Sequence, residues 1–122
     1  TLEPEAYRRL EEIGRWMTVN GPGIYATRPW TSFGEGEHIR FTASKDREYV
    51  YVFLLKWPGD SIGLTSIKAK KGSKVVMLGH GRSLNWEMKD DRLIIRLPET
   101  LQAEENRPCR HAWAFRLEIS RN

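Results

Sequence analysis

The chain has 122 residues, 20 Lys and Arg against 16 Asp and Glu, a net charge of +4, and 11% aromatic residues. This length suits one domain with a real hydrophobic core, and the aromatic content argues against disorder. The basic residues are spread among acidic ones, and no apolar run approaches the roughly 20 residues of a membrane span. We therefore expect neither a nucleic-acid partner nor a membrane partner.

The first predicted element is a helix over residues 3–18. Its apolar side chains recur at steps of three and four residues, and they form one stripe of Tyr7, Leu10, Ile13 and Met17. The pair Asn20-Gly21 is typical of a helix end. A single helix must bury such a stripe somewhere, so we expect this stripe to be a docking face. It packs either on the rest of the chain or on a body that the chain lacks.

Residues 22–36 are predicted to connect this helix segment, residues 1–21, to the remainder. The stretch Asn20–Trp30 reads NGPGIYATRPW, which is rich in anchoring groups for a linker. Pro22 and Pro29 restrict the backbone. We expect a rigid seam between domains, held by Tyr25, Arg28 and Trp30.

From residue 37 to residue 122 the hydrophobic period changes to two. Residues 49–57 are apolar at odd and even positions, which predicts a central strand buried on both faces, and residues 93–97 and 113–119 alternate. Turn signals recur about every ten residues. The pattern predicts an antiparallel β-sandwich of about seven to eight strands, mainly β, behind one N-terminal helix. The shorter predicted strands are 39–43, 62–67, 74–78 and 84–88, and residues 100–110 form a long polar loop.

No catalytic or metal-binding pattern stands out. The three histidines and the single cysteine, Cys109, lack ligand spacing and a nucleophile motif, and one cysteine excludes an internal disulfide. The carboxylates fall in turns, on the solvent face of the helix, or on outward strand positions, as with Asp60, Glu87 and Glu118. No pair has the setting of a glycosidase acid and nucleophile. We expect no catalytic residue, no metal and no cofactor.

The tryptophans leave one binding hypothesis open. Trp113 alternates with apolar residues and is predicted to lie in the core. Trp57 and Trp86 are more exposed in the predicted strands, and together with His80 they are candidates for carbohydrate contact. The alternative is that both tryptophans are rim residues that cover the core.

Several motifs, in order along nearly the whole chain, resemble the α-L-fucosidases of glycoside hydrolase family 29. Residues 12–21, EIGRWMTVNG, and 24–30, IYATRPW, are similar to the family's passage from its catalytic barrel into its C-terminal domain, with departures at Pro22, Gly23 and Ala26. The other matching stretches are YVYVFLLKWP at 49–58, VVMLGHG at 75–81, LNW at 84–86, LP at 97–98 and AWAFRL at 112–117.

The resemblance implies a last barrel helix followed by a C-terminal β-sandwich. The parent enzyme is then a retaining exo-glycosidase that hydrolyses α-L-fucosides without a metal, in a secreted, periplasmic or lysosomal location. The family's catalytic residues lie on earlier barrel strands, so none maps onto this chain, which we expect to be inactive alone. Its expected partners are the catalytic (β/α)-barrel and, through the parent, fucosylated glycans. Two alternatives remain: a carbohydrate-binding module, or a structural subunit that pairs with a separate barrel chain.

Overall fold

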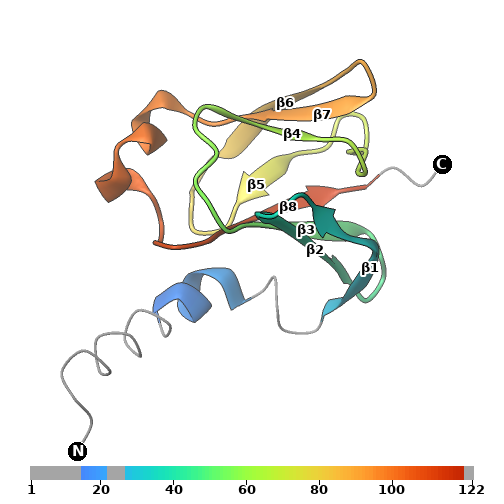
Figure 1. The fold of residues 1–122 in the computed structure, drawn as a ribbon, viewed down its shortest axis with the longest axis horizontal. Coiled ribbons are helices and arrows are strands. Elements are labelled where there is room, and N and C mark those ends of the chain that lie inside the picture. Colours follow the sequence, from blue (N-terminus) through green and yellow to red (C-terminus); the bar gives the residue numbers. More distant parts are fainter. Residues whose placement is uncertain (1–14, 22–26, 120–122) are drawn as a thin grey trace, which may run out of the picture.

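The computed structural model describes residues 15–21 and 27–119, with the backbone alone for residues 27–33. A helix over residues 15–20 precedes eight strands and two short 3-10 helices (Figure 1). No helix of the described part is both long and apolar enough to cross a membrane. The strands are β1 (Thr27–Glu35), β2 (Ile39–Ser44), β3 (Tyr49–Leu54), β4 (Ser61–Leu64), β5 (Val75–Met77), β6 (Ser83–Lys89), β7 (Arg92–Arg96) and β8 (Trp113–Glu118), and the 3-10 helices are η2 (Glu99–Gln102) and η3 (Glu104–Asn106).

The strands form one antiparallel sheet in the order β1-β2-β3-β8-β5-β6-β7-β4, folded into two layers. Strand β6 passes from one layer to the other, because Ser83 and Leu84 pair with β5 while Asn85–Lys89 pair with β7. Figure 1 shows β4, β6 and β7 lying over β1, β2, β3 and β8. The expected antiparallel sandwich is therefore confirmed, and its sheet curls far enough to approach a barrel.

The core lies between the two layers and follows the alternation of the strands. In β3, Val50, Val52 and Leu54 point inward and are buried, as are Phe115 and Leu117 in the neighbouring β8. Burying each such side chain contributes roughly 1.5–3 kcal/mol. The prediction that Trp113 lies in the core is confirmed, since only 6% of its surface is exposed.

Strand β3 is buried on its outer face too, as its sequence predicts. Tyr51 and Phe53 point away from the core and form a second apolar cluster with Ala114 of β8, against which Trp16 of the helix packs. Phe53 and Ala114 are register partners, so their side chains share one face of the sheet. This outer cluster is where the helix is attached.

Two parts of the fold differ from the sequence expectations. Residues 27–35, expected within a connector, form β1, which pairs with β2 and is the edge strand of the first layer. The register shifts between Pro29 and Gly34, and this irregularity hides the strand from a search for strict alternation. The polar loop at 100–110 carries η2 and η3, which hold Leu101 in the core with 2% of its surface exposed.

Candidate functional site

Trp16 fixes the helix to the sandwich. Its indole Nε1–H donates a hydrogen bond of 2.8 Å to the carbonyl oxygen of Ala112, directly before β8. Its ring lies against Phe53 on the outer face of β3, with the centroids 6.2 Å apart and the planes tilted by 35°. An indole that is packed and bonded at its polar edge holds one position, because both its surface and its N–H are satisfied. The helix is therefore attached rigidly to two adjacent strands.

Asn20 and Cys109 complete this attachment at the end of the helix. Asn20 is fully buried, and its Nδ2 donates to the carbonyl oxygen of Trp16 at 3.1 Å and to Cys109 Sγ at 3.4 Å. The Cys109 thiol donates in turn to Ala112 O at 3.0 Å. We call Trp16, Asn20, Cys109 and Ala112 the helix junction. Asn20 Oδ1 has no hydrogen-bond partner among the described residues.

The thiol of Cys109 is held in its neutral form. Burial raises the pKa of this thiol, and the hydrogen bond from Asn20 offsets only part of the increase. The thiolate is the nucleophilic form of cysteine, so this arrangement disfavours covalent chemistry. Cys109 acts here as a donor that secures the junction.

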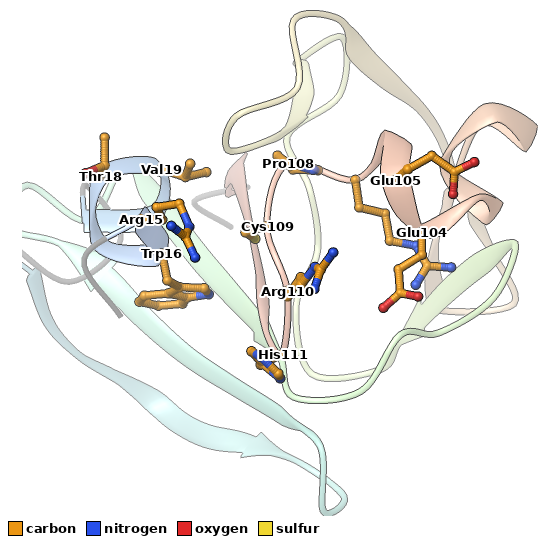
Figure 2. Close-up of a pocket in the computed structure, with 11 residues that line it drawn as sticks. Arg15, Trp16, Thr18, Val19, Glu104, Glu105, Pro108, Cys109, Arg110 and His111 are labelled. Carbon is orange, nitrogen blue, oxygen red and sulfur yellow. The ribbon is translucent and has the colours of Figure 1, made fainter. Parts of the chain in front are cut away.

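A cleft of about 580 Å³ opens beside the junction, between residues 15–19 of the helix and residues 104–111, which lead into β8. Figure 2 shows Arg15 on the helix side of the cleft and Glu104 and Glu105 on the opposite side. Trp16, Cys109 and their apolar neighbours line it as well. The loop side also carries Arg107 and Arg110, so the cleft has charges of both signs around an apolar base.

Trp57, a predicted carbohydrate contact, follows β3 and is half-buried against the core. The guanidinium carbon of Arg107 lies 4.0 Å from the centre of its ring, and Trp113 meets it edge-on at 5.0 Å. Its Nε1–H donates to Gln102 Oε1 at 3.1 Å. One face of this indole is therefore covered by a side chain of the same molecule.

Trp86 and His80, the other two carbohydrate candidates, lie elsewhere. Trp86 is on β6, half-buried against the core, and its Nε1–H donates to Ser73 O at 2.9 Å. His80 lies in the turn after β5. Neither lines the cleft, and Trp57 does not line it either. Both tryptophans do cover the core as rim residues, while carbohydrate contact stays a prediction for all three.

The predicted seam and docking stripe are only partly described. Tyr25, Tyr7, Leu10 and Ile13 lie outside the described residues. Arg28 and Trp30 are on β1, where Arg28 pairs with Ala43 of β2. Met17 is half-buried on the helix.

The residues that secure the helix were not singled out from the sequence. Trp16 stands three positions after Ile13, beside the predicted stripe, and Asn20 was assigned only to the helix end. Both residues hydrogen-bond to partners near residue 110, Ala112 and Cys109, and no local pattern points that far along the chain. In the described part, no three His, Cys, Asp or Glu side chains gather in a metal-binding cluster.

The α-L-fucosidase C-terminal domain family matches residues 35–118, from the end of β1 to the end of β8. The chain belongs to this family. The matched region is most of the sandwich, whereas the helix and one wall of the cleft precede it. The motifs quoted from the sequence had indicated the same family.

Curated relatives extend the likeness to the helix. The chain is 33% identical over 114 residues to plasma α-L-fucosidase of Homo sapiens, covering 89% of this chain and 24% of that protein. It is 35% identical over 119 residues to tissue α-L-fucosidase of Bos taurus, covering 95% of this chain and 25% of that protein. The chain thus spans about a quarter of the length of these relatives.

Solved structures have the same fold. The α-fucosidase of Thermotoga maritima, in complex with a mechanism-based inhibitor, superposes with a TM-score of 0.74 at 22% identity, over 97% of this chain and 27% of that one. A second structure of the Thermotoga maritima α-fucosidase gives a TM-score of 0.73 at 23% identity. The coverage includes the helix and the sandwich together, so their combination recurs in these proteins.

Proposed function

We propose that this chain is the non-catalytic C-terminal part of a longer α-L-fucosidase and that its sandwich supports a catalytic (β/α)-barrel. The observation that carries the proposal is the helix junction. Trp16 and Asn20 tie the helix to β3 and to the start of β8. A helix held by aromatic packing and partly buried hydrogen bonds can position whatever body is attached to its other side.

The helix has a second face for that body. Successive residues of an α-helix are rotated by about 100°, so Met17 points about 100° away from Trp16. The stripe of Tyr7, Leu10, Ile13 and Met17 falls around the direction of Met17 if the helical period continues. The sandwich takes the face with Trp16, and the proposal assigns the stripe predicted from the sequence to the barrel. The interdomain role of Tyr25, Arg28 and Trp30 belongs to the same proposal.

The proposed activity of the longer enzyme is retaining exo-hydrolysis of α-L-fucosides, with fucosylated glycans as substrates of the barrel. The carboxylates of the sandwich have other surroundings. Glu87, for example, lies on the open face of β6 and pairs with Arg96 at 2.7 Å, with both side chains about half exposed. A glycosidase works with two carboxyl groups that flank the bond to be cleaved, whereas the partner of Glu87 is an arginine. The catalytic carboxylates are therefore assigned to the barrel.

Hydrolysis of an aryl α-L-fucoside tests whether the catalytic groups lie outside this chain. The 122-residue chain alone is expected to show no turnover above buffer, and the longer protein that contains it is expected to hydrolyse the substrate. A matched control is the chain with Asp60→Asn, Glu87→Gln and Glu118→Gln. Turnover by the chain that survives these three changes would overturn the proposal.

A further inference from the structure

The first and last strands of the sheet order, β1 and β4, meet at one glutamate. Both are edge strands, and each pairs through its backbone with one neighbour, β2 and β7 respectively. Glu35, the last residue of β1, reaches Thr65 and Ser66, which directly follow β4. Unpaired strand edges are open to pairing with other chains, so a link between the two edges keeps them closed to such pairing.

The carboxylate of Glu35 accepts hydrogen bonds from two backbone groups and two hydroxyls. Oε1 accepts from the backbone N–H and from the hydroxyl of Thr65, each at 3.0 Å. Oε2 accepts from the backbone N–H of Ser66 at 3.1 Å and from its hydroxyl at 2.7 Å, and it shares the N–H of Thr65 at 3.1 Å. An ionised carboxylate is acceptor-only, with about four lone-pair sites, and therefore fits this set of donors.

We propose that Glu35, Thr65 and Ser66 form an acid-sensitive clasp that closes the sheet between β1 and β4. At neutral pH the ionised Glu35 holds both edges together. On acidification the carboxyl becomes an acid with an O–H of its own, which opposes the donors of Thr65 and Ser66, and the seam opens. This device goes beyond the support of a barrel, because it joins two edges within the sandwich and shares no residue with the helix junction.

The β1–β2 turn holds Glu35 in position for the clasp. A Cβ atom on Gly34 would collide with the carbonyl oxygen of Ile39, so only glycine lets the two backbones approach. Arg40 Nη1 then donates to Gly36 O at 3.1 Å and to Ile39 O at 2.8 Å, which bridges the turn. The reach of Glu35 across to β4 is thus built into the backbone of the turn.

The acid response follows from the contacts of Glu35. Partial burial by itself raises the pKa of this carboxyl, but the hydrogen bonds from Ser66 and Thr65 together outweigh it and lower the pKa below the ordinary glutamate value. A carboxyl whose pKa is depressed in the folded state stabilises that state above its unfolded value of about 4.3, and this contribution is lost as the pH falls through the folded value. The clasp therefore opens only in acid.

Other charged groups border the clasp. The β1–β2 turn carries Glu37 and His38, whose side chains lie 3.9 Å apart, and Arg40 of β2 is bound to the turn. On the side of β4, the Arg92 guanidinium of β7 lies over Gly63, and Lys68 follows Ser66. Glu35 is the carboxylate in contact with Thr65 and Ser66.

Amide hydrogen exchange measured by NMR tests the clasp on the 122-residue chain. The amides of Thr65 and Ser66 report directly, because both donate to Glu35. Glu35→Gln imitates the neutral carboxyl, and Glu37→Gln, two positions away and exposed, is the matched control. At pH 7, exchange corrected for the intrinsic rate should be about tenfold faster in Glu35→Gln than in the wild type, as for the loss of one charged hydrogen bond, and unchanged in Glu37→Gln.

The pH dependence gives a second, independent measurement. In the wild type, the protection of both amides should fall from pH 6 to pH 3 toward the level of Glu35→Gln, whose own protection should not vary. The amides of Val52 and Phe115 in the core serve as references for global unfolding. Equal wild-type protection at pH 6 and pH 3, or equal loss in Glu37→Gln, would overturn the proposal. If Glu35→Gln does not fold, the wild-type pH titration still decides. Neither result depends on turnover of a fucoside.

Discussion

The sandwich is secured at two places by opposite chemistry. At the helix junction, Trp16 and Cys109 both donate to one backbone carbonyl, that of Ala112, and an aromatic ring packs beside them. At the clasp, one carboxylate collects donors from Thr65 and Ser66. The junction contains neutral groups, and the clasp depends on an ionised one.

Because of this difference, the helix junction and the clasp respond differently to pH. A neutral, packed contact is stable over the pH range in which its donors stay protonated, whereas a contact made by a carboxylate depends on its ionisation. The junction joins the helix to the sheet, and in the proposed function it transmits the position of the barrel. The clasp joins two edges within the sandwich. The chain therefore holds its attachment to the helix independently of acid while its own seam responds to acid.

The largest effect is expected from Trp16→Ala, which disrupts the helix junction. The substitution removes the ring from Phe53 and the donor from Ala112 O, and we expect it to lower the free energy of unfolding by about 3 kcal/mol. Urea unfolding measures the loss, and Trp16→Phe, which keeps a ring without the N–H, should lose about 1 kcal/mol. The loss in Trp16→Ala should be the same at pH 7 and pH 4. A pH-dependent loss would mean that the junction is not neutral.

Gly34→Ala should disrupt the clasp indirectly, by distorting the β1–β2 turn that positions Glu35. The new methyl group meets the backbone oxygen of Ile39, which cannot move without disturbing the β1–β2 pairing, so we expect a loss of about 2 kcal/mol. Part of this loss should vanish in acid, once Glu35 is protonated and the clasp is open. Urea unfolding at pH 7 and pH 3 measures both terms. An identical loss at the two pH values would separate the turn from the clasp.

The smallest effect is expected from Cys109→Ala, which removes one weak thiol donor from Ala112 O while Trp16 still donates to the same oxygen. We expect a loss below about 1 kcal/mol. Because burial raises the pKa of the Cys109 thiol, the contribution of this group is complete at neutral pH and declines as the pH rises above about 8.5. Alkylation by iodoacetamide at pH 8 should be slow in the wild type and faster in Trp16→Ala. Equal rates would show that the junction does not shield the thiol.

The sequence determined most of the sandwich by itself. The apolar run at residues 49–57 and the alternation at residues 113–119 predict two strands, which the structure pairs as β3 and β8. The turn at Asp90 and Asp91 joins β6 to β7 with both residues at positive φ, as in tight hairpins. These features depend on neighbours along the chain. The motifs were sufficient to identify the family for the same reason, since they are local strings of residues.

The positions of the helix junction and of the clasp follow from the tertiary structure and not from the sequence pattern. Trp16 meets Ala112 across 96 positions, and Glu35 meets Thr65 across 30. Gly34-Glu35-Gly36 has the pattern of an ordinary turn, and nothing in it indicates that two sheet edges will converge there. Periodicity reports which face of an element is apolar, but it does not report which distant backbone group that face will meet. The order of the strands and the curl of the sheet settle that, because they bring distant residues within hydrogen-bonding distance.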